Sequence, residues 1–264
     1  MKIRNTVFDF SNTTYIMGIL NVTPDSFSDG GLHNSVQDAV NHALSMIEDG
    51  AAIIDIGGES TRPGHVPVDA DEELRRVIPV IEALRKETDI PISIDTTKAT
   101  VAAESLRAGA DIVNSVAGLA LTDDMISVVR DSGAPFVMTY ENSYVNQFGE
   151  ALIGMAEKAV EAGIDPAKLI VDPGVGFGKS LEDNLRIVNE LPIITQIGYP
   201  ILLGCSRKSM IGNVLGVPED ERLPGTLVTT VLATLAGVGI VRVHDVKENV
   251  MSVKMLKAIC GQEG

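Results

Sequence analysis

Short apolar segments rich in Val and Ile alternate along the chain with longer segments in which apolar residues recur every three or four positions. Apolar runs of four to eight residues are typical of buried strands, and the longer segments are typical of amphipathic helices. The pattern therefore predicts eight strand-and-helix units in succession. The strand-like runs lie at residues 15–22, 52–58, 90–96, 111–116, 135–140, 168–174, 200–206 and 239–245.

Three of the intervening segments carry further information. Segment 69–88 begins with acidic and ends with basic residues, as the helix dipole favours, and Pro79 inside it predicts a kink or a restart. Segment 226–239 is almost wholly apolar, so we expect it to be buried or to lie at an interface. Segment 35–50 predicts a helix with one apolar face, formed by Val36, Val40, Ala43, Leu44 and Ile47.

Eight such units in about 250 residues are typical of a barrel of eight parallel strands surrounded by helices. The alternating residues 1–13, which precede the first unit, predict a short N-terminal hairpin. We therefore predict an α/β fold, a single (β/α)₈ TIM barrel with a short N-terminal hairpin, and one domain over residues 1–264. A doubly wound open sheet is the alternative.

Composition and charge restrict the function. The chain has 264 residues, no Trp and 4% aromatic residues, so its core consists mostly of aliphatic side chains, as in parallel strands buried on both faces. Its net charge of −15 argues against a broad nucleic-acid-binding face. An anionic substrate would need a local patch of positive charge or a metal ion.

The cysteines and the N-terminus bear on the compartment. Cys205 and Cys260 lack metal-ligand spacing, and we interpret both as reduced thiols of a cytoplasmic protein. Residues 1–12 contain no apolar core of a signal peptide, and no run approaches 18 apolar residues. We therefore expect no membrane partner.

The glycine-rich stretch DPGVGFGKS at 172–180 superficially resembles a nucleotide-binding loop. A P-loop requires glycine five positions before Gly178, where the chain has Pro173. The dinucleotide fingerprint requires glycine where the chain has Lys179. The spacing therefore argues against both nucleotide sites and leaves a strand that ends in Asp172 and a tight glycine turn.

Polar side chains occur at the carboxyl ends of seven of the eight predicted strands, the end at which TIM barrels carry their active sites. One such residue alone is typical of a turn or a cap, but buried carboxylates that converge require a ligand with matching donors. The anionic and cationic members together predict a pocket for a ligand with a donor-rich end and an anionic end. These members are Asp55, Asp95, Asp172, Arg62, Lys208, Arg242 and His244, with Asn21, Asn114 and Ser206 beside them.

Two polar, breaker-rich segments follow the first two strands, at 23–31 and 59–69. Because they belong to adjacent strands, we expect them to form a lid; ordinary surface loops are the alternative.

Six stretches resemble the dihydropteroate synthase family, in order and over nearly the whole chain. The resemblance implies a TIM barrel that condenses 6-hydroxymethyl-7,8-dihydropterin diphosphate with p-aminobenzoate, releasing 7,8-dihydropteroate and diphosphate. It also implies a sulfonamide target that uses Mg²⁺ and forms a homodimer. The stretches are MGILNVTPDSFSDGG (17–31), DIGGESTRPG (55–64), SIDTTK (93–98), DPGVGFGKS (172–180), SRKSMIG (206–212) and RVHDVKE (242–248).

The resemblance also implies a role for each matching position. Asp95, Asn114, Asp172 and Lys208 match the pterin-ring positions, Arg242 and His244 match the diphosphate-binding pair, and Asn21 matches the Mg²⁺ ligand. Thr61, Arg62, Pro63, Ser206 and Phe177 match positions near p-aminobenzoate and diphosphate, and Asp55, Met138 and Gly204 complete the substrate-binding set. The predicted catalytic residues are Asp95, Asp172, Lys208, Arg242 and His244.

Two places depart from the family pattern. Thr139 stands where the family usually has His, in a segment (138–150) that is shorter than usual, and Ser115 stands where it usually has Asp. A pterin-dependent methyltransferase and a pterin-binding relative that does not release diphosphate therefore remain as alternatives. The RVHD and SRKS stretches favour the synthase, because a methyltransferase has no evident need for a diphosphate site.

Overall fold

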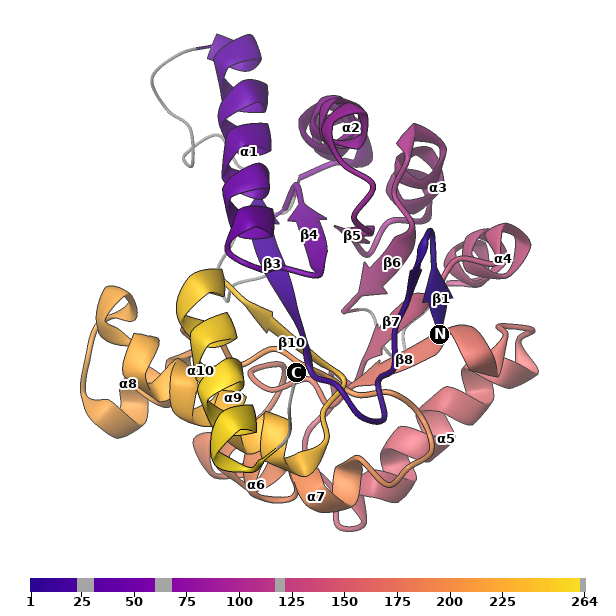
Figure 1. Cartoon of the computed structure of the whole chain (residues 1–264). Coiled ribbons are helices and arrows are strands. Elements are labelled where there is room, and N and C mark those ends of the chain that lie inside the picture. The colour runs from indigo at the N-terminus through magenta and orange to yellow at the C-terminus, as the bar shows by residue number, and fades with distance from the viewer. Residues whose placement is uncertain (23–30, 60–67, 117–121, 262–264) are drawn as a thin grey trace.

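The computed structural model describes residues 1–22, 31–59, 68–116 and 122–261, and it contains the predicted barrel (Figure 1). Eight parallel strands follow the order β8-β7-β6-β5-β4-β3-β10-β9, and a bridge between Val171 and Ile201 joins the two outer strands. All eight predicted strands are present. They are β3 Tyr15–Asn21, β4 Ile53–Gly57, β5 Ile92–Asp95, β6 Ile112–Ser115, β7 Phe136–Thr139, β8 Leu169–Asp172, β9 Leu202–Leu203 and β10 Ile240–Val243.

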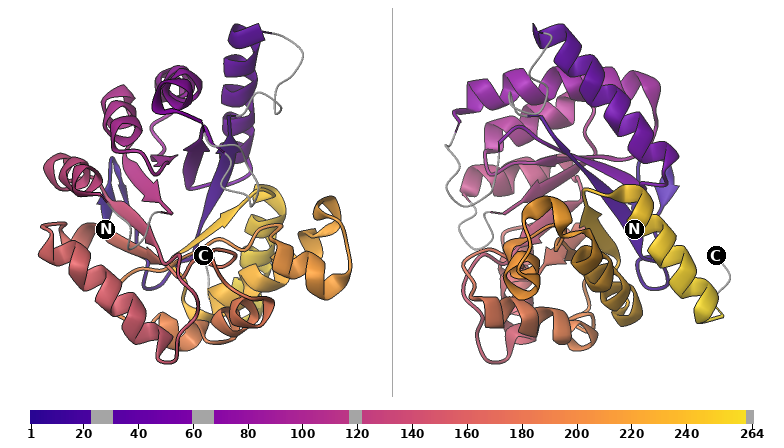
Figure 2. Two further views of the ribbon diagram at one scale, coloured as in Figure 1. Left: turned by 180° about the vertical axis from the view of Figure 1, so that it is seen from behind. Right: turned by 90° about the vertical axis from the view of Figure 1, so that its left-hand side faces the viewer.

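Helices surround the strands as an outer ring (Figures 1 and 2). Pro79 neither ends nor restarts its helix, which is continuous over Ala70–Glu87 and is capped by the Asp69 side chain, which accepts a bond from the Glu72 N–H at 2.8 Å. The helices are α1 Gly31–Glu48, α2 Ala70–Glu87, α3 Ala99–Ala108, α4 Asp123–Ser132, α5 Phe148–Glu161, α6 Leu181–Asn189, α7 Leu191–Ile194, α8 Ser209–Leu215, α9 Leu223–Ala236 and α10 Val246–Ile259, with 3₁₀ turns η3 Pro166–Lys168 and η4 Glu219–Glu221.

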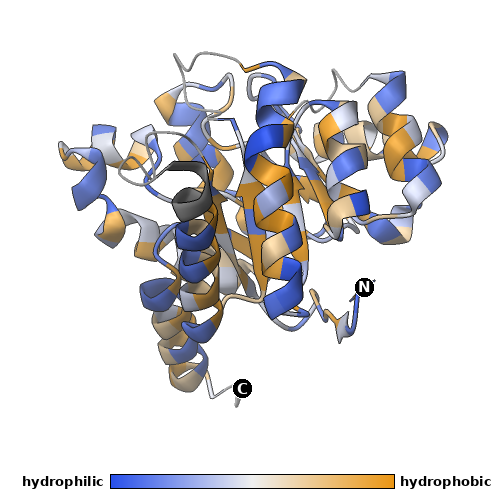
Figure 3. Cartoon of the chain, turned by 90° about the horizontal axis from the view of Figure 1, so that it is seen from above, coloured by the Kyte–Doolittle hydropathy of each residue, from blue (hydrophilic) through white to orange (hydrophobic). Residues whose placement is uncertain are grey.

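The two-residue period of the strands divides the core into two clusters. Side chains such as Ile54, Ile94 and Val171 point outward and pack under the helices, including Val40 and Ala43 of α1 as predicted. Apolar residues gather on the strands, and polar residues lie on the outer surfaces of the helices (Figure 3). The second cluster fills the inside of the barrel at the amino ends of the strands, and consists of Ile3, Phe8, Phe10, Met17, Ile53, Ile112, Val137, Ile170, Leu202 and Ile240.

The predicted N-terminal hairpin closes this end of the barrel. Strands β1 (Lys2–Ile3) and β2 (Thr6–Val7) pair antiparallel, and Ile3 and Phe8 are almost fully buried. Phe8 packs edge-on against Tyr15 at the start of β3, with ring centroids 4.7 Å apart. The hairpin therefore acts as an apolar plug inside this end of the barrel, whereas the carboxyl ends of the strands open onto a pocket that strand-end residues line.

Helix α9 is not buried on all sides, so the first of the two expectations for segment 226–239 is wrong, and the second, an interface, stays a prediction. Its buried face is mostly threonine, whereas Val228, Leu232 and Leu235 are exposed. The threonine face is satisfied by hydrogen bonds, such as that from Thr230 to Asn249 of α10 at 2.7 Å. Among the residues that the structure describes, no helix combines the length and apolar character required to cross a membrane.

Candidate active site

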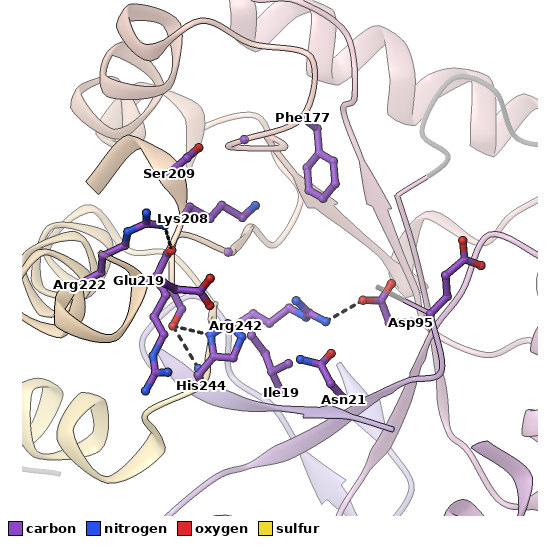
Figure 4. Close-up of a pocket in the computed structure, with 15 residues that line it drawn as sticks. Ile19, Asn21, Asp95, Phe177, Lys208, Ser209, Glu219, Arg222, Arg242 and His244 are labelled. Carbon is purple, nitrogen blue, oxygen red and sulfur yellow. Dashed lines mark hydrogen bonds and ion pairs between the residues drawn. The ribbon is translucent and has the colours of Figure 1, made fainter. Parts of the chain in front are cut away.

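The carboxyl ends of the strands surround a cavity of about 250 Å³ (Figure 4). Phe177 and Lys208 lie on one side of it and Asn21 and Asp95 on the other, with Arg242 reaching across. Because parallel strands in a barrel end at the same rim, residues as far apart in sequence as 21 and 244 meet here. The predicted residues that line this cavity are Asn21, Asp95, Phe177, Gly204, Ser206, Lys208, Arg242 and His244.

Arg242 organises the acidic floor beneath the cavity. Its Nε donates to Asp55 Oδ2 at 2.5 Å, and an Nη donates to Asp95 Oδ2 at 2.7 Å. Asn114 donates to the same Asp55 oxygen at 3.1 Å. These bonds use two of the five N–H donors of the guanidinium, which leaves donors for an anion in the cavity.

The other oxygens of the two carboxylates are not satisfied. Within the described part of the chain, Asp55 Oδ1 and Asp95 Oδ1 are buried without a hydrogen-bond partner, and so is the hydroxyl of Thr139. A buried carboxylate oxygen without a donor is costly, so such atoms mark a place where a ligand supplies the donors. The floor of the site is therefore suited to a ligand that is rich in N–H groups.

Burial dominates the electrostatics of the floor. It raises the pKa of Asp95 to about 7, although Arg242 opposes the shift, and it also raises the pKa of Asp172. Burial acts to lower the pKa of Arg242, but Asp55 and Asp95 outweigh it, so this pKa lies above its ordinary value. The arginine therefore stays charged, whereas the two carboxylates gain from any ligand that donates to them.

The turn that follows β8 positions Lys208. The ammonium of Lys208 donates to the Val175 carbonyl and lies 4.5 Å from the centre of the Phe177 ring. Gly176 has φ +86°, a conformation that favours glycine, and a Cβ on it would lie 3.0 Å from Cδ of Lys208, so glycine lets the lysine stem approach the turn. Burial lowers the pKa of Lys208, and Asp172 opposes that shift.

The cationic rim is held by contacts between the ends of β9 and β10. The Ser206 hydroxyl lies 3.0 Å from His244 Nδ1 and accepts a bond from the His244 backbone N–H at 3.1 Å. Next to it, Arg207 forms a two-point ion pair with Asp245, with Nε donating at 2.9 Å. Asp245 therefore orients Arg207, whereas Ser206 fixes the His244 ring at the edge of the cavity.

Asn21 fits a single-ligand metal site. Its amide oxygen and Asp95 Oδ2 both lie 3.9 Å from the Cβ that Gly57 lacks, so the two oxygens share one side of the cavity. The described ranges contain no group of three His, Cys, Asp or Glu residues that could hold a metal. Mg²⁺ often uses only one or two protein oxygens together with substrate phosphates, and the Asn21 amide suits that arrangement.

The GKS end of the glycine-rich stretch has structural tasks. The Lys179 ammonium donates to three backbone carbonyls, and Ser180 caps α6 in a capping box with Asp183. The arrangement agrees with the spacing argument against a nucleotide loop. Cys205 is buried, and burial raises the pKa of its thiol to about 12, so this cysteine belongs to the core.

The position of Met138 differs from its predicted place in the substrate-binding set. This residue packs in the cluster between the barrel and the helices, whereas Thr139 is paired with Asp172 and lies on the inner face. The two-residue period of β7 sends the Met138 side chain away from the cavity, so the structure contradicts its assignment to the substrate-binding set. Thr61, Arg62 and Pro63, and most of the two segments expected to form a lid, lie outside the described residues.

Sequence reasoning missed several residues of the cavity wall. Glu59 and Ser209 belong to the quoted GGES and SRKS stretches, so a closer reading of those stretches would have included them. Glu219 and Arg222 come from the segment between α8 and α9, where no motif signals a site. Arg222 donates to the Arg207 carbonyl at 2.8 Å, a contact that only the fold creates.

Comparison with known proteins identifies close relatives. A family model described as "Pterin binding enzyme" matches residues 17–244. The dihydropteroate synthase of Bacillus subtilis is 48% identical over 97% of this chain and 92% of its own. The crystal structure of a dihydropteroate synthase from Clostridium difficile in the presence of pteroic acid is 51% identical, with a TM-score of 0.90 over 96% of this chain and 99% of that one. A Yersinia pestis dihydropteroate synthase with a sulfonamide drug is 40% identical, with a TM-score of 0.90 and 99% of both chains covered.

Proposed function

The chain belongs to the pterin-binding enzymes and, among them, to the dihydropteroate synthases, and from this premise we propose how its residues divide the reaction among them. The enzyme condenses 6-hydroxymethyl-7,8-dihydropterin diphosphate with p-aminobenzoate. The observation that carries the proposal is the pair of buried, unpartnered carboxylate oxygens of Asp55 and Asp95 beside a cationic rim.

The pterin ring lies on the acidic floor. Its amino and ring N–H groups donate to Asp95 and Asp172, and Asn114 adds an amide that both donates and accepts. Lys208 faces the acceptor atoms of the ring from the side of Phe177. Support comes from the buried Oδ1 of Asp95, which has no hydrogen-bond partner, and from the burial that raises the pKa of Asp172.

The diphosphate lies at the rim, where Arg242 and His244 supply N–H donors and positive charge. Asp55 and Asp95 hold the guanidinium in place, so it is already oriented when the substrate arrives. Asn21 would hold Mg²⁺, and the ion would supply further charge neutralisation for the leaving group. Support for the metal is the accessible amide oxygen of Asn21 next to Asp95.

p-Aminobenzoate occupies the side of the cavity formed by Phe177, Lys208 and Ser206. The ring packs against the Phe177 face, and the Lys208 ammonium keeps this side positive, which suits a carboxylate. We also assign Thr61, Arg62 and Pro63, from the polar segment 59–69, to the binding of p-aminobenzoate.

The chemical step is a substitution at the exocyclic methylene of the pterin. The carbon–oxygen bond breaks and diphosphate leaves with the bonding electrons, held by Arg242 and His244. The electron-rich ring delocalises the positive charge, and Asp95 and Asp172 stabilise it. The amine nitrogen of p-aminobenzoate then forms the new bond to carbon and releases a proton to water. No strong base is needed, since this nitrogen is neutral and nucleophilic near pH 7.

The enzyme forms a homodimer through α9 and α10. These helices pack side by side, and their outer surfaces expose Val228, Leu232 and Leu235 together with Met251, Met255 and Ile259. A patch of large apolar side chains on adjacent helices is typical of a subunit interface. Val228→Glu with Leu232→Glu should convert the dimer to a monomer in sedimentation experiments; an unchanged mass would exclude this interface.

The two cysteines support a cytoplasmic location. Cys205 and Cys260 are both free thiols, and an exposed free thiol such as Cys260 is typical of a reducing compartment. Localisation of a tagged chain by fractionation tests this proposal.

The first experiment follows diphosphate release from 6-hydroxymethyl-7,8-dihydropterin diphosphate in the presence of Mg²⁺. We expect release that depends on p-aminobenzoate, stops when Mg²⁺ is chelated, and is blocked by a sulfonamide. Titration of Asn21→Ala with Mg²⁺ and diphosphate by calorimetry should show weakened binding of the ion if Asn21 is its ligand.

The same assay separates the alternatives. The relatives support the synthase rather than the methyltransferase, since those compared are dihydropteroate synthases. Binding of the pterin without any release of diphosphate would mean that Thr139 and Ser115 have removed the chemistry, and the assigned residue roles would then fail.

A further inference from the structure

Lys179 is a partly buried lysine that the proposed reaction does not use. Its Nζ donates to the carbonyl oxygens of Tyr140 at 2.7 Å, Gly174 at 2.9 Å and Phe177 at 3.0 Å. An ammonium group has three N–H donors, so these bonds satisfy it completely. The ion lies 5.3 Å from the centre of the Tyr140 ring. Lys179 therefore binds the turn after β8 to the residue that follows β7.

The backbone at this point is suited to such a cation. Gly174 has φ +71°, and a Cβ on it would lie 2.0 Å from the Tyr140 carbonyl oxygen, so the two segments approach as closely as backbone allows. Three carbonyl oxygens converge on one point, where their dipoles repel each other. One ammonium both neutralises this repulsion and supplies the donors that buried carbonyls need.

The turn that Lys179 holds carries groups of the active site. Its Gly174 N–H donates to Asp172 Oδ1 at 2.8 Å, which orients the carboxylate. Its Val175 carbonyl accepts from the Lys208 ammonium, and its Phe177 ring lies under the same ammonium. A shift of the turn would therefore move Asp172, Phe177 and Lys208 together.

We propose that Lys179 is a positioning residue for the synthase reaction, which acts by fixing the turn 174–177 and, through it, the side chains that meet both substrates. The inference rests on the proposed function of Asp172, Phe177 and Lys208. It assigns a task to the lysine of the GKS stretch, although that lysine contacts no substrate.

The contacts by which Lys179 holds the turn depend on pH, because they need the protonated ammonium. Burial lowers the pKa of Lys179 to about 8, with Asp172, Asp183 and Glu141 opposing this shift and Lys208 adding to it. Loss of the proton removes the charge and one N–H donor, so one carbonyl loses its partner. The turn is therefore held below this pKa and loosens as the pH rises through it.

The experiment compares purified Lys179→Met and Lys179→Arg enzymes with the wild type and with Lys158→Met. Lys158 is an exposed lysine of α5 and serves as the matched control. At pH 7 we expect kcat/KM for p-aminobenzoate to fall by about tenfold or more in Lys179→Met, since small displacements of positioned groups are costly. Lys158→Met should equal the wild type.

The pH profile provides the readout that a purely structural role would not move. The wild type should lose kcat/KM above about pH 8, and Lys179→Arg, whose guanidinium stays charged, should retain activity beyond that point. If Lys179→Met does not fold, Lys179→Cys treated with bromoethylamine is the second variant, because this treatment restores an ammonium group with a lower pKa than that of lysine. The activity of this modified enzyme should fall at a lower pH than the activity of the wild type. Treated wild type controls for alkylation of Cys260.

Two results would overturn the inference while the synthase function stands. One is a Lys179→Met enzyme with the kinetics of the wild type. The other is an alkaline limb that stays at the same pH in the arginine and aminoethylcysteine enzymes. A wild-type enzyme without p-aminobenzoate-dependent diphosphate release would instead refute the proposed function.

Discussion

The two ends of the barrel interior differ although the same strands build both. At the amino end most inward side chains, Ser93 of β5 excepted, are apolar, buried and covered by the N-terminal hairpin. Two residues later on each strand, the next inward side chain faces the cavity end. Five strands change in this way from an apolar to a polar side chain, from Ile53 to Asp55, Ile112 to Asn114, Val137 to Thr139, Ile170 to Asp172 and Ile240 to Arg242.

Within one strand, the residue at the closed end contributes to stability and the residue at the open end contributes to the chemistry. Apolar side chains at the closed end gain from leaving water, on the order of 1.5–3 kcal/mol for each large one. Carboxylates at the open end lose their hydration and have too few partners, and burial shifts the pKa values of Asp95 and Asp172 upward. The closed end therefore stabilises a site that by itself would oppose folding.

Asp172→Asn should have the largest effect of the changes at the open end. The neutral amide can no longer stabilise the pterin cation, so kcat should fall on the order of 100- to 10,000-fold while the fold persists. Single-turnover measurements of diphosphate release, with circular dichroism as the folding control, test this. Near-normal turnover would show that neither Asp172 nor the carboxylate floor stabilises the pterin cation.

Ile170→Ala tests the closed end of the same strand. Ile170 is fully buried two residues before Asp172, so its truncation should lower the free energy of unfolding by about 2–5 kcal/mol. Urea titration measures the loss. The enzyme that remains folded should keep its kcat, and a large loss of kcat without a loss of stability would contradict the division between the two ends.

Arg242→Lys tests the link between the carboxylate floor and the rim. Lysine keeps the charge but cannot donate to Asp55 and Asp95 at once in fixed directions, so the rim loses its orientation. We expect kcat/KM to fall by about 10- to 100-fold, with the effect of diphosphate as a product inhibitor weakened in parallel. Unchanged inhibition by diphosphate would indicate that Arg242 serves only the floor.

Asp95→Asn should show that the open end opposes folding. Because the pKa of Asp95 is raised to about 7 in the folded protein, the native state holds a proton that the unfolded chain releases at lower pH. Stability is therefore lost as the pH rises from the ordinary carboxyl range through about 7. Relative to Asp95→Asn, the wild type should lose stability on the order of 2–3 kcal/mol between pH 5 and pH 8.

Thermal unfolding across this range, in the absence of substrates, measures that difference. Asp38→Asn is the matched control, since Asp38 is an exposed carboxylate of α1. A stability difference between wild type and Asp95→Asn that does not change with pH would show that Asp95 is not destabilised by its burial.

Much of this molecule was predictable because the relevant signals are local. The eight strands follow from the apolar runs, and the residues at their carboxyl ends follow from the rule that barrels open at that end. Met138 shows the limit of this reasoning. A motif match placed Met138 in the pocket, but in β7 its side chain points toward the helices. Neighbouring residues of a strand point to opposite faces, so a shift of one residue decides which side a side chain takes.

Contacts between distant segments needed the tertiary structure. Sequence predicted that Arg242, Asp55 and Asp95 belong to one site, but not that the arginine joins the two carboxylates and leaves an oxygen of each without a partner. Arg222 lies in no motif, and the GKS stretch does not show what Lys179 contacts, because each of the two acts on backbone carbonyls. The sequence by itself determined the barrel and the chemical kind of its residues, since periodicity and residue type are local properties. Only the closed barrel decided which donors meet which acceptors, because that pairing depends on the distances between strands that lie far apart in the chain.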